Sequence, residues 1–348
     1  MLQLPENLTA EQFLAQYWQK KPLFMLQAAE ALRPTVTRNE LAWLATLEDV
    51  ESRIVFTDRG NKRTLYRVET GPFDTAFLQA LPKRDWTLLV HDVDKHLPTM
   101  RRLFKLVPFI PDWRIDDLMV SFAAPGGGVG PHRDKYDVFL FQGIGIRDWH
   151  ISEDNVAEDN AASGDLALLQ EFAGDENHVT RSGDVLYLPP DVAHWGTARR
   201  ACITYSIGMR APPGYRDPDL QLDEVGAGYI APTARKRAEK LTYDLGCEVT
   251  AVKEWLRPIA PTAEELDALL DDPVTLQRLQ LHGMARVAFD DSCVYVNGEK
   301  RTLEHDVRRP LGALCRQRRL DKALAVKLQD QCLRWLLAQG AFALPEKT

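Results

Sequence analysis

The feature that most constrains the fold is a series of short segments rich in β-branched and aromatic residues, each bounded by Gly, Pro, Asn or Asp. They lie at residues 53–56, 86–90, 118–122, 138–141, 149–152, 185–188 and 203–207. Many short strands with frequent turn residues are typical of a sandwich or a small barrel. We therefore expect the first 211 residues to form a mainly β domain of this kind, preceded by short helices at 9–17 and 37–47.

The strand pattern stops at the segment Met209-Arg210-Ala211-Pro212-Pro213-Gly214, which predicts a domain boundary. Apolar residues then recur at three- and four-residue steps, which predicts helices at 233–245, 248–256 and 262–270. After residue 280, two short strands, an Asn297-Gly298 turn and a helix at 321–339 are expected. The predicted domains are 1–211, 212–280 and 281–348, the last with the order of elements of a winged helix.

Charge and composition narrow the class of protein. The net charge is −7, but residues 281–348 carry 12 Lys and Arg against 8 Asp and Glu, a net charge of +4. An acidic body favours a basic partner. The basic cluster of the C-terminal region comprises Arg308, Arg309, Arg316, Arg318 and Arg319. From sequence alone, we favour a structural role for this region over contact with RNA.

Two further features of the sequence bear on the cellular compartment of the protein. The longest uncharged stretch considered, residues 118–131, is too short for a membrane helix, which needs about 20 apolar residues. The five cysteines are scattered and form no Cys-x-x-Cys pair, so neither a disulfide framework nor a cysteine zinc site is expected. Because the N-terminus also lacks the pattern of a signal peptide, we expect a cytoplasmic protein with no membrane contact.

Chemistry centres on a glycine-rich segment, residues 125–131, which leads into His132-Arg133-Asp134. No Gly-Lys-Ser/Thr follows, so it is not a phosphate loop. On a strand, His132 and Asp134 project to the same face. A turn and a short strand at 182–188 precede His194, which in a barrel can face that pair. Two imidazoles and a carboxylate on one face form the facial triad of non-haem Fe(II) oxygenases, although zinc or manganese would accept the same ligands.

The motifs around this triad resemble those of JmjC-type cupins, and specifically the bacterial ribosomal oxygenases. The matching segments are Trp113-Arg114-Ile115-Asp116-Asp117-Leu118, Tyr136-Asp137-Val138-Phe139, Gln142-Gly143, Arg147-Asp148-Trp149 and Gly183-Asp184. Two earlier segments, Tyr17-Trp18-Gln19-Lys20-Lys21-Pro22-Leu23 and Gly71-Pro72-Phe73, fit the same family. The resemblance is strongest from Trp113 to Pro212 and architectural after that.

The resemblance implies an α+β, mainly β, chain with three parts. A double-stranded β-helix barrel is followed by a helical dimerisation region and a C-terminal winged-helix-like domain, so a homodimer is expected. It also implies an enzyme that uses Fe(II), 2-oxoglutarate and dioxygen to hydroxylate an arginine of the L-sixteen protein of the large ribosomal subunit. His132, Asp134 and His194 are then the metal ligands.

The far carboxylate of 2-oxoglutarate needs a cation, and an arginine suits it because its planar fork gives two hydrogen bonds. Lys135, Arg147 and Arg210 compete. Lys135 directly follows Asp134, so strand alternation turns it to the opposite face. Similarity to the family favours Arg147, two residues before Trp149, and Arg210 stays open as the alternative.

A substrate arginine needs a carboxylate beside the metal. Asp116 and Asp117 are adjacent on a strand, so only one of them points inward. The resemblance favours Asp116, with Tyr136 and Ser206 as walls of the substrate pocket.

Two rival functions stay open at this point. One keeps the same metal and cosubstrate chemistry in a demethylase or in a hydroxylase of another residue. The other is a metal-binding cupin without oxygenase activity, such as an isomerase or a scaffold.

Overall fold

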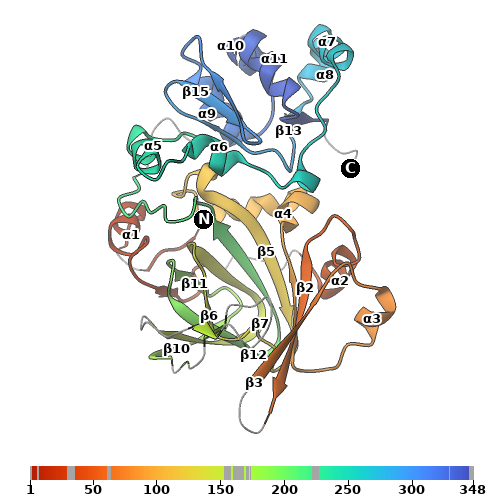
Figure 1. Ribbon diagram of the computed structural model, residues 1–348, viewed down its shortest axis with the longest axis vertical. Coiled ribbons are helices and arrows are strands. Elements are labelled where there is room, and N and C mark those ends of the chain that lie inside the picture. The colour runs from red at the N-terminus through yellow and green to blue at the C-terminus, as the bar shows by residue number, and fades with distance from the viewer. Residues whose placement is uncertain are drawn as a thin grey trace. The chain divides into compact units, whose positions relative to one another are not determined.

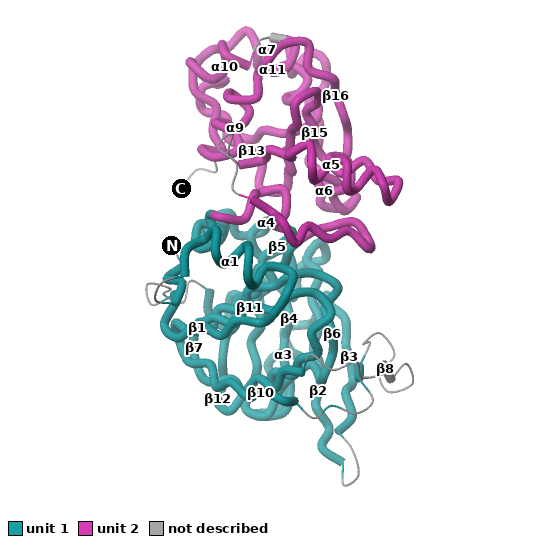
Figure 2. The backbone as a smooth tube through the Cα atoms, turned by 90° about the vertical axis from the view of Figure 1, so that its left-hand side faces the viewer, with its two compact units in different colours: residues 1–108, 116–209 teal, residues 109–115, 210–348 magenta. Residues whose placement is uncertain are grey.

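The computed structural model describes residues 2–5, 8–29, 36–60, 64–152, 158–159, 168–169, 172, 174–221, 227–328 and 330–344. The chain divides into two compact units, shown in Figure 2. Unit 1 comprises residues 1–108 and 116–209, and unit 2 comprises residues 109–115 and 210–348. The division falls two residues before the boundary expected at 211. The helices of the expected middle domain share unit 2 with the C-terminal region.

Unit 1 is built on one antiparallel sheet of ten strands (Figure 1). Eight of them follow the order β1-β11-β7-β12-β5-β4-β2-β3, while β10 pairs with β7 and β6 pairs with β12. The bounds are β1 Leu23–Met25, β2 Ser52–Arg59, β3 Thr64–Thr70, β4 Trp86–Val90, β5 Ile115–Ala123, β6 His132–Arg133, β7 Val138–Ser152, β10 Glu176–Arg181, β11 Val185–Leu188 and β12 Ala193–Met209. A further pair joins β8 (Glu158–Asp159) to β9 (Leu168–Leu169). The large antiparallel sheet confirms the mainly β expectation.

The sheet departs from expectation at β7, because the predicted strands 138–141 and 149–152 are one continuous strand. The prediction of two separate strands is therefore wrong, because residues 143–145 continue the strand. Gly145 has a φ of +75°, and a Cβ there would lie 2.2 Å from the Ala201 carbonyl oxygen of the adjacent β12. The glycine is needed for close approach between two paired strands, and the register shifts of β12 opposite it mark a local irregularity.

Short helices flank the sheet of unit 1 (Figure 1). Helix α1 (Ala10–Gln16) begins at Thr9 and α2 (Arg38–Leu44) begins at Thr37, each through a reciprocal capping box. Both fall within the predicted ranges. Phe13 of α1 packs edge-on against Tyr187 of β11, with ring centroids 5.0 Å apart. Unit 1 also contains α3 (Thr75–Gln79), α4 (Val93–His96) and the 3₁₀ helix η1 (Pro98–Leu106).

Unit 2 combines small sheets with short helices around its own apolar core. Its sheets are β14 (Val287–Phe289), β15 (Cys293–Val296) and β16 (Glu299–Thr302), and the pair β13 (Gln280–Leu281) and β17 (Phe342–Ala343). Its helices are η2 (Asp112–Arg114), α5 (Pro232–Glu239), α6 (Leu245–Thr250), η3 (Glu254–Leu256), α7 (Ala263–Asp271), α8 (Pro273–Leu276), α9 (Arg308–Gln317), α10 (Lys322–Leu328) and α11 (Asp330–Ala338). The predicted helix 321–339 corresponds to α10 and α11, and residue 329 between them lies outside the described residues.

The helices expected between 233 and 256 are shorter than predicted. Helix α5 ends at Glu239, and α6 begins at Leu245 because the Asp244 side chain accepts a hydrogen bond from the Cys247 N–H. Apolar periodicity located these helices, while capping fixed their ends. No helix among the described residues has the length and apolar character needed to cross a bilayer.

Candidate metal and cosubstrate site

The glycine-rich loop brings the first predicted ligand to the sheet by close backbone packing. A Cβ on Gly128 would lie 2.5 Å from the carbonyl oxygen of Gly196 in β12, so only glycine fits without a shift. The loop also exchanges backbone hydrogen bonds with Ala198, at 2.7 and 2.9 Å. These contacts hold the glycine-rich loop against β12. The chain then enters β6, where His132 pairs with His194 of β12.

The structure brings the three predicted ligands into one cluster. Nε2 of His132 lies 3.9 Å from Oδ1 of Asp134, and Nε2 of His194 lies 3.6 Å from its Oδ2. One ligand atom from each residue lies within 4.8 Å of the others. Among the described residues, these are the one group of three or more such side chains with the spacing for a metal ion. Their donor set, two nitrogens and one carboxylate, suits a divalent transition metal.

Backbone carbonyls orient both imidazoles. Nδ1 of His132 lies 3.0 Å from the Gly130 oxygen, and Nδ1 of His194 lies 3.0 Å from the Val192 oxygen. Because a carbonyl oxygen only accepts, each Nδ1 donates and each Nε2 keeps its lone pair facing the cluster.

Burial, aided by the neighbouring His132, lowers the pKa of His194 to about 4. His194 is therefore neutral at physiological pH, which is the form that binds a metal.

Arg147 supplies the second half of the site. Residues 147, 149 and 151 of β7 are all buried, whereas the residues between them are less so, so all three project to one face. The guanidinium carbon of Arg147 lies 5.5 Å from the centroid of the Trp149 ring, and that ring lies 6.0 Å from the His194 ring. Trp149 thus spans the distance between the arginine and the metal ligands.

The charge of Arg147 is not matched by any described acidic side chain. Arg147 is 5% exposed, and its Nε and Nη2 have no hydrogen-bond partner among the described residues. A buried, unpaired guanidinium is costly unless a bound anion completes it. The residues present therefore fit both a divalent metal and a carboxylate a short distance from it.

The two competing cations are engaged elsewhere. Lys135 is exposed and pairs with Asp191 at 3.1 Å. The Arg210 guanidinium donates to the Ala251 carbonyl within unit 2. Neither arrangement presents a buried guanidinium without a described acidic partner, as Arg147 does.

Asp116 and Asp117 are adjacent on β5, and the structure shows which of the two points toward the face of Trp149. Oδ1 of Asp117 lies 3.1 Å from where a Cβ on Gly208 would stand, and Gly208 pairs with Val138, which packs with Trp149. Side chains of paired residues share a face, so Asp117 points to the face that bears Trp149, and its neighbour Asp116 points away. Of the two adjacent carboxylates, the one that points to the face of Trp149 is therefore Asp117 and not Asp116, which the family resemblance had favoured.

Tyr136 and Ser206 also lie near this face. The Tyr136 ring is 3.8 Å from the same Cβ position on Gly208, and the charge of Asp134, together with that of the nearby Asp117, raises the pKa of Tyr136 well above its usual value. Ser206 pairs with Leu140, another member of the cluster around Trp149, and is buried.

Sequence reasoning missed His91 of the segment after β4. Its Nδ1 lies 3.6 Å from Oδ2 of Asp117, and the Asp92 N–H donates to the same oxygen at 3.3 Å. Burial raises the pKa of Asp117, and His91 opposes that effect. No motif links His91 to the site, since only the pairing of β4 with β5 brings them together.

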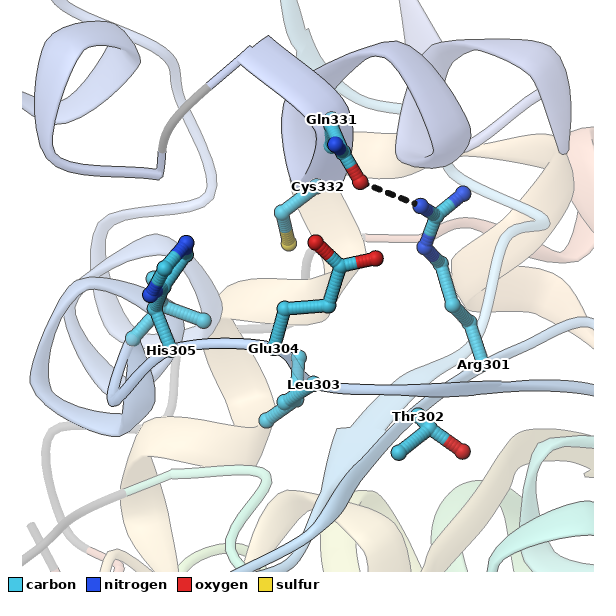
Figure 3. A pocket seen from close by; sticks show the side chains of 8 residues that line it. Arg301, Thr302, Leu303, Glu304, His305, Gln331 and Cys332 are labelled. Atoms are coloured by element: carbon cyan, nitrogen blue, oxygen red, sulfur yellow. Dashed lines mark hydrogen bonds between the residues drawn. The ribbon is translucent and has the colours of Figure 1, made fainter.

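Unit 2 has a cavity of about 180 Å³, whose lining side chains differ from those of the His-Asp-His cluster. Figure 3 shows Arg301 crossing one side of it to donate to Gln331, with Glu304, His305 and Cys332 around the rest. Cys332 is buried, which raises its thiol pKa to about 11 and disfavours the thiolate that binds metals.

Comparison with known proteins agrees with this geometry. The JmjC domain family matches residues 102–216. The chain is 33% identical to the ribosomal protein uL16 3-hydroxylase of Escherichia coli strain K12 over 321 residues, covering 83% of this chain and 84% of that one. It is also 33% identical to a probable ribosomal oxygenase of Haemophilus influenzae over 286 residues, covering 78% and 69%.

Solved structures extend the likeness to the whole chain. The X-ray structure of E. coli YcfD matches with a TM-score of 0.76 and 28% identity over 99% of both chains. The same ribosomal oxygenase in complex with cobalt and 2-oxoglutarate matches with a TM-score of 0.70 at the same identity, again over 99% of both chains. With a JmjC domain, a matching fold and this level of identity, the chain belongs to the family of JmjC-domain ribosomal oxygenases.

Proposed function

We propose that this protein is an Fe(II)- and 2-oxoglutarate-dependent oxygenase that hydroxylates an arginine side chain of a large-subunit ribosomal protein of the uL16 type. One observation carries the proposal: the same face of the sheet bears a His-Asp-His cluster and a buried arginine that has no described acidic partner. The relatives' names support the substrate class, and the cobalt and 2-oxoglutarate complex of YcfD supports the cofactor and cosubstrate.

The chain's own residues divide the work. His132, Asp134 and His194 would hold the metal on one side, leaving the other side open. Arg147 would bind the far carboxylate of 2-oxoglutarate, with Trp149 covering the space between. With Fe(II) and 2-oxoglutarate bound, the site gains the chemistry to insert one oxygen atom of dioxygen into a C–H bond. Positioning then decides which C–H bond reacts.

The choice of arginine as substrate rests on Asp117. The Asp117 carboxylate is partly buried, and its Oδ2 interacts with His91 and the Asp92 N–H, so among the described residues its Oδ1 is available to accept from a guanidinium. Tyr136 and Ser206 would form the walls around the aliphatic stem. A guanidinium can form two parallel hydrogen bonds with this carboxylate, whereas a methylated ammonium offers only its charge and fewer N–H donors, so we favour hydroxylation of arginine over demethylation of lysine.

The partner would be the ribosomal protein itself, which places the reaction in the cytoplasm where ribosomal proteins are made. A homodimer formed through α5–α7 is part of the same proposal, and it rests on the family resemblance of the sequence alone. Size-exclusion chromatography with light scattering tests that part.

The function itself is tested with purified protein, Fe(II), 2-oxoglutarate and a panel of ribosomal-protein peptides, read by mass spectrometry. The proposal expects a gain of one oxygen atom on an arginine and succinate in equal amount. A gain on another residue, or loss of a methyl group, would redirect it to one of the rival oxygenase activities. Absence of both succinate and product would favour a cupin without oxygenase activity.

A further inference from the structure

The cations of the C-terminal module, residues 281–344, fall into two groups in the structure. One group is engaged: Arg308 pairs with Asp306 and Asp291, and Lys300 pairs with Asp244. The other group makes no ion pair or side-chain hydrogen bond with a described residue. Its members are Arg309, Arg316, Arg319, Lys322 and Lys327.

All members of the second group are exposed and lie on α9, on the turn after it, or on α10. Arg309 and Arg316 are seven residues apart on α9, so they lie on one helix face. We call the exposed side of residues 309–327 the α9–α10 face. The module's cations that have no described partner are therefore concentrated in one short segment.

The acidic groups near this face do not neutralise it. Asp321 accepts a hydrogen bond from the Leu324 N–H at 2.8 Å at the start of α10, where a carboxylate compensates the helix terminus. Asp306 is bound by the two-pronged Arg308 side chain. Glu304 lies at the cavity in Figure 3, in the loop that precedes α9. The remaining charge of the face is positive.

The shape of the segment suits a polyanion. Helices α9 and α10 are joined by the four residues 318–321, the turn length of a helix-turn-helix. A membrane surface is less suitable, because Val326 is the one large apolar side chain that this face exposes among the described residues. The first 280 residues carry a net charge of −11, which disfavours binding of a polyanion to that part of the chain compared with the α9–α10 face.

We propose that the α9–α10 face binds the phosphate backbone of RNA. This inference extends the proposed function, because a ribosomal-protein substrate occurs beside ribosomal RNA, but its test needs no turnover. Contact with backbone phosphates would add affinity and orientation without reading sequence. The sequence alone favoured a structural role, since it could not show which cations were already paired.

The test measures binding of a fluorescein-labelled RNA hairpin by anisotropy over a series of KCl concentrations. The variant R309Q/R316Q/R319Q/K322Q removes four charges and keeps good helix formers, so the fold is retained. The matched control K83Q/R102Q/K105Q/R200Q removes the same charge from exposed positions of unit 1, away from the helices proposed to form the dimer. We expect the first variant to bind at least about tenfold more weakly, with a shallower salt dependence by about 0.7 per lost contact, while the control binds as wild type.

Three outcomes overturn the inference. Wild type does not bind the RNA, both variants lose the same RNA affinity, or phosphatidylglycerol vesicles displace the RNA from this face. Hydroxylation of a free ribosomal peptide is measured in parallel and should be unchanged in both variants. Wild type that binds RNA without hydroxylating the peptide would contradict the proposed function alone. Wild type that hydroxylates the peptide without binding RNA would contradict the RNA surface alone.

Discussion

His132 and His194 stand opposite each other on the paired strands β6 and β12, with ring centroids 4.2 Å apart. The pairing places two side chains that are far apart in the sequence on one face, beside Asp134. Cross-strand register therefore builds the metal cluster, and the Gly128 packing against Gly196 maintains that register.

Replacing His194 by alanine removes one of the proposed metal ligands. We expect Co(II) affinity, measured by calorimetry, to fall by more than about 100-fold. A loss of about 10- to 100-fold is typical when a residue that only hydrogen-bonds to a metal ligand is replaced. The matched control is His178→Ala, since His178 pairs with Glu176 and lies outside the cluster. Equal Co(II) affinity in the two variants would remove His194 from the metal site.

Arg147→Met keeps the volume of the side chain and removes its charge. We expect 2-oxoglutarate affinity to fall at least tenfold, in line with about 2–5 kcal/mol for truncating one partner of a buried charge pair. Because the charge is buried without a partner in the free protein, the ligand-free melting temperature should stay level or rise.

Arg210→Met is the control for that experiment, since its guanidinium already donates to the Ala251 carbonyl. It should leave 2-oxoglutarate affinity unchanged. Loss of affinity in Arg210→Met with retention in Arg147→Met would reverse the assignment.

Asp117→Asn and Asp116→Asn differ by one strand position and test the substrate carboxylate. We expect the first to raise the KM for an arginine peptide at least tenfold, because it removes a charge-assisted pair. The second should leave this KM near the wild-type value, since Asp116 points to the other face. Affinity for Co(II) and 2-oxoglutarate should be the same in both, and a larger KM effect at Asp116 would contradict the strand phase found here.

Much of this site follows from the sequence. Alternation correctly put Arg147 and Trp149 on one face, because both lie on the regular half of β7. At Asp116 and Asp117, alternation predicted correctly that only one side chain points inward, but it could not say which one, because nothing local fixes the phase of β5. It is set by pairing with β4, a long-range contact.

Other features needed the three-dimensional structure for the same reason. The glycines at 143 and 145 have the composition of a turn, but they serve close contact between β7 and β12. The lack of a described acidic partner for Arg147 is a property of its whole surroundings, and no spacing along the chain can show it.

Asp290 of unit 2 gives a prediction about stability and pH. It is buried and accepts hydrogen bonds from the Ser292 and Cys293 N–H groups, both at 2.7 Å, and from the Tyr295 hydroxyl at 2.8 Å. Burial opposes ionisation, but these bonds and the one from Arg235 outweigh it and lower the pKa of Asp290. The ionised carboxylate therefore stabilises the fold above its unfolded pKa of about 3.9, and this is lost as pH falls through the lowered value.

Asp290→Asn should lower the free energy of unfolding by about 2–3 kcal/mol at neutral pH, in the range for a hydrogen bond to a charged group. The difference from wild type should shrink in acid, as followed by thermal melts of the full chain across pH. Asp306→Asn, at an exposed position, should change stability less. A deficit in Asp290→Asn that grows in acid would contradict the sign.

The most direct test of the central claim is a crystal structure of the protein with Co(II) and 2-oxoglutarate, read by anomalous scattering from the metal. The account predicts a single cobalt peak bonded to Nε2 of His132, the carboxylate of Asp134 and Nε2 of His194, with the far carboxylate of 2-oxoglutarate on the Arg147 guanidinium. A cobalt peak that lacks any one of these ligands, or a cosubstrate carboxylate bound away from Arg147, would contradict it.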